Sequence, residues 1–357
     1  MTIVRVLLLA ALACVLPGCG TRYLTQAAAG ELHVLIQRRP IDSVVLDSRT
    51  PEEVRQALFT VREARQFASH VLKLPDNGSY RTYADIDRPY VVWNVVATPE
   101  FSVAPRRWCF PIAGCVAYRG YFSRRNALAF AADLSDRGYD VMVGGVAAYS
   151  TLGRFSDPVL STMIDYGDTE LAAMIFHELA HQLLYVKNDS EFNEAFAMTV
   201  EAAGVQRWLQ QHGQQAAFAA YLSGRERERK FVDLFARARA KLARLYASGM
   251  SVDEMRTRKA RVFSQLADDL RALELRLKVH SSLYDGWLAH GLNNAHLASL
   301  ATYYDCMPGF ERLLAEQGGD LQGFYAAAGR LATRPRSERH RELCSKPATQ
   351  AMTEKAR

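Results

Sequence analysis

His177-Glu178-Leu179-Ala180-His181 is the stretch of this sequence on which the predicted fold centres. Apolar residues recur before and after it at helical spacing, which predicts a helix. Residues four apart on a helix share a face, so the imidazoles of His177 and His181 can reach one metal ion while Glu178 lies beside them. The stretch therefore predicts a helical region built around a metal site.

A third metal ligand is expected from a second helix, whose start Asp189 or Ser190 can cap. Zinc in catalytic sites usually takes three protein ligands and leaves a fourth position for water. Glu194, thirteen positions after the second histidine, is the natural third ligand, and Glu191 is the alternative. Water beside one Zn²⁺ ion and the carboxylate of Glu178 predicts hydrolysis, with Glu178 as general base and then proton donor.

Glu201 lies seven residues after Glu194, on the same face of the predicted helix. It is a candidate outer partner that would orient a metal ligand through a hydrogen bond. The two segments together supply the parts of a zinc hydrolase site, with His177, His181 and Glu194 as ligands.

The amino-acid sequences of both segments resemble those of the gluzincin metallopeptidases, especially the aminopeptidase N type. Most of the chain after the amino terminus is also similar to a bacterial family of predicted zinc-dependent aminopeptidases anchored as lipoproteins. That likeness is carried by residues 74–77, 90–94, 108–111, 118–121, 148–153 and 292–295. The resemblance implies an α+β gluzincin-like core, in which a small mixed or antiparallel sheet covers the metal helices and added helices surround them. Two features of aminopeptidase N differ, because the histidine-to-glutamate gap is shorter here and the Gly-x-Met-Glu-Asn segment is missing.

The gluzincin likeness implies further roles for residues outside the metal motif. An edge strand over residues 146–155 would bind an extended substrate by strand addition, and an internal strand is the alternative. A tyrosine from a later helix would stabilise the oxyanion, while amides would contact the substrate backbone. The candidates are Tyr149, Ser150, Thr151, Leu152 and Gly153 on the strand, Tyr303 or Tyr304 for the oxyanion, and Asn293 and Asn294 for the backbone.

Removal of amino-terminal residues from peptides is the leading prediction. Such exo-cleavage needs acidic or carbonyl groups that hold the substrate's free amine, and Asp157, Asp165 and Glu191 are available. Two alternatives remain, namely a zinc endopeptidase acting on envelope proteins and a non-catalytic, zinc-holding lipoprotein that works as an interaction module.

The amino terminus has the pattern of a lipoprotein signal peptide over residues 1–18. Arg5 precedes an apolar run at residues 6–16 that is too short to span a bilayer, and Leu-Pro-Gly-Cys ends at Cys19. We therefore expect lipidation of Cys19 and a chain that faces the periplasm, with ordinary secretory cleavage as the alternative. Gly20 favours the outer membrane, by resemblance to such lipoproteins.

In that oxidising compartment the remaining cysteines are expected to form disulfides. These four cysteines permit three pairings. Cys109 with Cys115, which would close a tight loop, is the first choice, and Cys306 with Cys344 then follows by elimination.

The composition fits a globular protein, with 357 residues and 49% hydrophobic content. Because its net charge of +6 is mild and scattered, no nucleic-acid partner is expected. We predict one peptidase domain over residues 19–335, with a sheet-containing part (41–167) and a helical part (168–335) that includes a helical hairpin at 224–279. Residues 336–357 are predicted to be a loose tail, and the sequence predicts no oligomeric state.

Overall fold

The computed structural model describes residues 19–110, 114–279 and 284–344, with side chains from residue 23 onward. The predicted signal peptide and the side chain of Cys19 lie outside this description. Across the described ranges, no helix combines the length and apolar character needed to cross a membrane.

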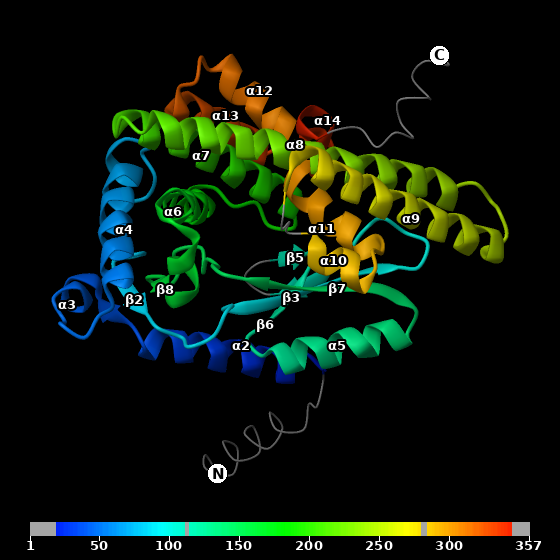
Figure 1. Cartoon of the computed structure of the whole chain (residues 1–357), viewed down its shortest axis with the longest axis horizontal. Coiled ribbons are helices and arrows are strands. Elements are labelled where there is room, and N and C mark those ends of the chain that lie inside the picture. Colours follow the sequence, from blue (N-terminus) through cyan, green and yellow to red (C-terminus); the bar gives the residue numbers. More distant parts are fainter. Residues whose placement is uncertain (1–18, 111–113, 280–283, 345–357) are drawn as a thin grey trace, which may run out of the picture.

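The fold is mixed α+β, mostly helical with small sheets (Figure 1), as the sequence predicts at this level. The first part of the chain alternates helices with short strands: α2 Cys19–Ile36, β1 Arg39–Pro40, α3 Ile41–Val45, α4 Glu52–His70, β2 Thr82–Ala84, β3 Val92–Pro99, β4 Trp108–Phe110, β5 Gly114–Val116, β6 Arg119–Tyr121, α5 Arg124–Asp136, β7 Tyr139–Val146 and β8 Val159–Leu160. After the 3₁₀ helix η1 the described chain is helical: η1 Ser161–Tyr166, α6 Asp168–Leu183, α7 Ser190–Gln211, α8 Gln215–Tyr246, α9 Val252–Leu277, α10 Asp285–His290, α11 Asn294–Tyr304, α12 Met307–Glu316, α13 Leu321–Ala332 and α14 Arg336–Leu343.

The strands form small sheets of both predicted kinds. One is mixed, with β2 antiparallel to β1 and parallel to β8. The larger one is antiparallel in the order β6-β3-β7, and it packs between α5 and α11 (Figure 1). β4 and β5 form a hairpin in which Cys109 faces Cys115, and the predicted disulfide joins them.

Helices α6 and α7 form the centre of the main hydrophobic core. Phe176 on α6 is fully buried, and Gly204 on α7 lies so close that an added Cβ would come within 2.7 Å of the Phe176 ring. Any larger residue at Gly204 would push the two helices apart. The first turns of α7 are buried on all sides, because α4, α11 and α12 also pack around this pair.

The predicted helical hairpin is present as α8 and α9, which pack against each other along their length (Figure 1). Ser251 caps α9 by accepting a hydrogen bond from the backbone N–H of Glu254. The hairpin has its own apolar core, which is separate from that of α6 and α7.

Two predictions about local structure are wrong. Residues 147–158 form an irregular loop instead of a strand over 146–155, because β7 ends at Val146 and the following side chains bond within the loop. In the sheet β6-β3-β7, β7 itself is one of the two edge strands. The predicted loose tail also begins with an ordered helix, α14.

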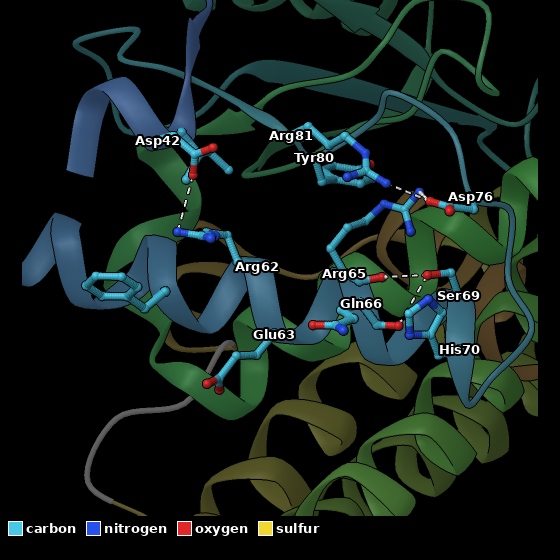
Figure 2. A pocket seen from close by; sticks show the side chains of 12 residues that line it. Asp42, Arg62, Glu63, Arg65, Gln66, Ser69, His70, Asp76, Tyr80 and Arg81 are labelled. Atoms are coloured by element: carbon cyan, nitrogen blue, oxygen red, sulfur yellow. Dashed lines mark hydrogen bonds and ion pairs between the residues drawn. The ribbon is translucent and has the colours of Figure 1, made fainter. Parts of the chain in front are cut away.

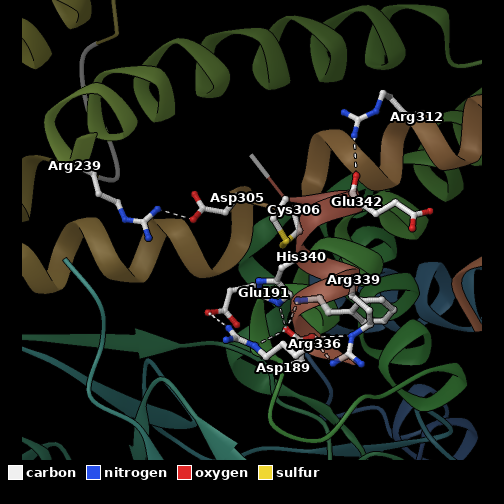
Figure 3. Close-up of a disulfide and its surroundings, with 12 residues drawn as sticks. Asp189, Glu191, Arg239, Asp305, Cys306, Arg312, Arg336, Arg339, His340 and Glu342 are labelled. Carbon is white, nitrogen blue, oxygen red and sulfur yellow. Dashed lines mark hydrogen bonds and ion pairs between the residues drawn. A yellow bond between two sulfur atoms is a disulfide. The ribbon is translucent and has the colours of Figure 1, made fainter. Parts of the chain in front are cut away.

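Helix α14 is tied down by charges and by a disulfide (Figure 3). The carboxylate of Asp189 lies 2.6 Å from Nη2 of Arg339 and 2.6 Å from Nε2 of His340, and Cys306 is bonded to Cys344 as predicted. Burial would raise the pKa of Asp189, but hydrogen bonds from His340 and Arg339 hold it below its usual value. Because Asp189 also caps α7, this cluster fixes the start of the helix that carries Glu194.

Candidate metal centre and active site

Helix α6 brings the two histidines of the motif together. Nε2 of His177 lies 3.1 Å from Nε2 of His181, and both side chains are largely buried. The one-turn spacing of the motif places both rings on the same face of α6.

Helix α7 adds the carboxylate of Glu194. Its Oε2 atom lies 3.4 Å from Nε2 of His177 and 3.6 Å from Nε2 of His181. A tetrahedral zinc ion with bonds of about 2.0–2.1 Å would hold its ligand atoms roughly 3.3–3.4 Å apart. The three donor atoms therefore fit one such ion. The alternative ligand, Glu191, pairs instead with Arg336 at 3.1 Å.

Glu201 lies behind the histidines as predicted. Its Oε2 atom is 3.0 Å from Nδ1 of His177, which leaves Nε2 of that ring directed at Glu194. Nδ1 of His181 is buried and has no hydrogen-bond partner among the described residues. The orientation of His177 is therefore set by a carboxylate, and that of His181 by packing.

The electrostatics of the group favour an ionised Glu194. Burial alone would raise the pKa of Glu194, but the two imidazoles lower it to about 2. Burial raises the pKa of Glu178, against the lowering effect of the same imidazoles. The carboxylate of Glu178 has no hydrogen-bond or ion-pair partner among the described residues. It stands beside the donor group and is free to exchange a proton.

Of the two tyrosines predicted to assist, the structure brings only Tyr303 to the group. The charge of Glu194 is the largest cause that raises the pKa of Tyr303, followed by burial and the neighbouring Tyr118. Tyr304 instead donates its hydroxyl hydrogen to Glu228 on α8.

Two further tyrosines near Glu194 were missed by sequence reasoning. Burial and then the charge of Glu194 raise the pKa values of both Tyr118 and Tyr185. Tyr185 lies two residues beyond the end of α6, so helical spacing does not place it. Tyr118 precedes β6 in a region with no metal-site pattern, so only the tertiary fold brings it close to Glu194.

The side chains of Asn293 and Asn294, the predicted substrate contacts, form hydrogen bonds within the protein. Asn293 caps α11 and donates from its side chain to the backbone oxygen of Val141 at 2.9 Å. Asn294 is fully buried, and its side chain bonds to Tyr246 and to the backbone of Glu100. Both asparagines join α11 to its neighbours.

Loop 147–158 places its polar side chains around Asp157. Thr151 donates to that carboxylate from Oγ1 at 2.6 Å and from its backbone at 3.1 Å, while Ser150 Oγ lies 3.4 Å away. Tyr149 donates to Glu31 of α2. Leu152 and Gly153 have positive φ values of 59° and 73°, as in a tight turn. Asp165, another candidate for the substrate amine, is exposed on η1.

A large surface cavity lies away from this group. It has a volume of about 620 Å³ and is lined mainly by α4 (Figure 2). Its charged side chains pair with one another, with Arg62 3.2 Å from Asp42 and Arg81 2.7 Å from Asp76. None of the proposed metal ligands lines it, although Tyr80 does.

Comparison with known families gives one match. The model of a family described as "Putative aminopeptidase" matches residues 22–343, which is most of the chain. The chain belongs to the putative aminopeptidase family. No curated protein and no solved structure matches it. The metal-donor group and the loop around Asp157 both lie within the matched residues of this aminopeptidase family. Membership supports a peptidase activity, with peptides as substrates.

Proposed function

We propose that this chain is a zinc-dependent aminopeptidase. The observation that carries the proposal is the set of three donor atoms, 3.1–3.6 Å apart, contributed by His177, His181 and Glu194 with Glu178 beside them. This donor set suits zinc, which takes imidazole and carboxylate ligands at a catalytic site. Family membership supports peptides as the substrate class.

Each of these side chains has a separate role in the proposed hydrolysis. A zinc ion held by His177, His181 and Glu194 would supply Lewis acidity to the peptide carbonyl and acidify the attacking water. Glu178 accepts the proton of that water at its carboxylate and then delivers it to the leaving amine. The hydroxyl of Tyr303, which has no partner among the described residues, donates a hydrogen bond to the developing oxyanion.

The proposed location is the cell envelope, through a lipid on Cys19. It rests on the apolar amino-terminal run ending in Leu-Pro-Gly-Cys and on two disulfides, which suit an oxidising compartment. The chain would then face the periplasm, with the outer membrane as the expected site.

The test compares Glu178→Gln with Glu170→Gln, an exposed glutamate on the same helix. Zinc content and hydrolysis of aminoacyl reporters and amino-blocked peptides are measured for the full-length chain and both variants. We expect one zinc per chain throughout, and cleavage of free-amine substrates that falls by roughly 10²–10⁴-fold only in Glu178→Gln.

Three other outcomes would contradict parts of this proposal. Cleavage of amino-blocked peptides would make the protein an endopeptidase. Bound zinc without hydrolysis of either class would favour the interaction module. Full activity without a metal ion would exclude the zinc mechanism.

A further inference from the structure

A second acidic group lies near Glu178, away from the metal donors. Asp157 is only 3% exposed, and its carboxylate accepts hydrogen bonds from Thr151 and from Nε2 of Gln182 at 3.4 Å. Glu31, from α2, accepts one from Tyr149, and its charge reaches Asp157. All these donors are neutral, and within the described ranges neither carboxylate forms an ion pair. Glu31 is only partly buried, and the charge of Arg38 acts on it from beyond ion-pair distance. A buried carboxylate without a cation is costly, so Asp157 calls for a positive partner.

Tyr80 provides an independent sign of a missing ligand. The side chain is 2% exposed, and its hydroxyl has no hydrogen-bond partner in the described structure. Its backbone N–H donates to the backbone oxygen of Asp157 at 2.6 Å, which joins the two residues directly. Burial, followed by the charges of Glu178 and Asp157, raises the pKa of Tyr80. The orphan hydroxyl therefore lies near these carboxylates, and the charge of Arg65 on α4 acts on it as well.

The backbone at Tyr80 is also unusual. Its φ angle is 62°, in the left-handed region that a bulky residue seldom adopts. Such conformations persist where the surrounding structure enforces them, often at binding sites. This conformation occurs at the residue whose backbone N–H is bonded to the backbone oxygen of Asp157.

The position of Asp157 relative to Glu178 suits a short substrate segment. Asp157 is hydrogen-bonded to Gln182, which follows Glu178 by four residues and shares its face of α6, a rise of about 6 Å. In a peptide, about 2.5 Å separates the terminal nitrogen from the first carbonyl carbon, and a charge-assisted hydrogen bond adds about 2.8 Å. A carboxylate that holds the amine is therefore expected roughly 5 Å from the carbon under attack.

We propose that Asp157, Glu31 and Tyr80 bind the free α-ammonium group of the substrate. This inference rests on the proposed aminopeptidase function and assigns the residues that restrict it to amino-terminal cleavage. An ammonium carries three N–H donors, and two carboxylates and a phenol oxygen offer three acceptors. The Gly-x-Met-Glu-Asn segment that aminopeptidase N uses at the amino end is absent from this chain.

The experiment measures binding without turnover. L-Leucinamide and N-acetyl-L-leucinamide are titrated calorimetrically into the zinc-loaded, full-length Glu178→Gln protein. We expect the free amine to bind at least about tenfold more tightly than the acetylated compound. Asp157→Asn or Glu31→Gln, added to Glu178→Gln, should remove most of that difference, whereas Asp165→Asn on the exposed η1 should leave it intact.

The outcomes separate this inference from the proposed function. Equal affinity for the two compounds, no binding of either, or discrimination that survives both Asp157→Asn and Glu31→Gln would overturn the ammonium site. Binding of a second zinc ion that Asp157→Asn removes would also overturn it in favour of a metal. Failure of the wild-type chain to hydrolyse any peptide, with discrimination preserved, would instead overturn the function and leave the site in place. If Asp157→Asn does not fold, Glu31→Gln and Tyr80→Phe carry the same test.

Discussion

Two acidic groups near α6 differ in how their charge is balanced. The group on α7, Glu194 and Glu201, faces the imidazole of His177 at 3.4 and 3.0 Å. Among the described residues, the group formed by Asp157 and Glu31 accepts hydrogen bonds from hydroxyl, amide and backbone N–H donors, and Arg38 acts on Glu31 from beyond ion-pair distance. Their pKa values reflect this, because the imidazoles lower that of Glu194 to about 2 whereas burial raises that of Asp157 to about 6.

This difference matches the two roles that we propose for these groups. Carboxylates that face imidazoles are arranged to hold and orient a metal ion. A buried carboxylate without a paired cation is costly, which supports the proposed binding of an ammonium group at Asp157. If Glu178 acts between them, the scissile carbonyl belongs on the α7 side and the amine on the Asp157 side.

The largest effect is expected at Tyr303, on the metal side. Tyr303→Phe removes the hydroxyl that faces Glu194 and should lower kcat by about 10²–10³-fold with little change in KM. Tyr304→Phe is the matched control, since its hydroxyl bonds to Glu228. Steady-state kinetics of both variants provide the measurement. Equal losses would show that neither phenol assists the oxyanion specifically.

A smaller effect is expected at Glu201, which tests whether the outer carboxylate orients the metal ligand. Glu201→Gln keeps a hydrogen-bonding group near Nδ1 of His177 but removes its charge. Zinc affinity should fall by roughly 10–100-fold. Competition with a chelator measures it directly. An unchanged zinc affinity would show that Glu201 only packs against His177 and does not orient it as a metal ligand.

The metal side could be predicted from the sequence because its parts follow helical spacing. His177, His181, Glu194 and Glu201 occupy two consecutive helices, and each pair repeats at four or seven residues. The cap at Asp189 was also predictable, since its residue type and position match a helix start.

The amine side could be predicted only in part. Asp157 was a candidate by residue type, but Glu31 comes from α2 and Tyr80 from the segment before β2, so no local pattern relates them. Loop 147–158 was misread as a strand because its small and β-branched residues fit one, while the hydrogen bonds to Asp157 that bend it are tertiary. Helix α14 was missed because its sequence is polar, and the ion pairs with Asp189 that hold it in place join residues far apart in the chain.

The pH dependence of binding should distinguish the two acidic groups. With the pKa of Asp157 raised to about 6 by burial, next to Glu31, Glu178, Tyr80 and Tyr149, the ionised fraction rises about tenfold between pH 5 and 7. Affinity for L-leucinamide should rise similarly, and that for the acetylated compound should not. A flat profile for the free amine would argue against Asp157 as its partner.

The raised pKa of Asp157 has the opposite effect on stability, which should fall as pH rises. Because the folded chain holds this proton more tightly than the unfolded chain, the contribution of Asp157 to the free energy of unfolding falls as pH rises from about 4 to about 6. Thermal unfolding of wild type and Asp157→Asn across this range measures it. We expect a smaller decline in the variant, which has no carboxyl group to titrate at this position.

The smallest and most selective effect is expected from Tyr80→Phe. Removing a buried hydroxyl that has no partner should leave the free energy of unfolding unchanged or raise it by about 1 kcal/mol. If that hydroxyl accepts a hydrogen bond from the substrate ammonium, the same variant should bind L-leucinamide several-fold more weakly. A purely structural tyrosine cannot combine unchanged or greater stability with weaker binding of the free amine alone. If the variant binds each compound as tightly as the wild type does, Tyr80 only packs in the fold, and the carboxylates bind the ammonium group without it.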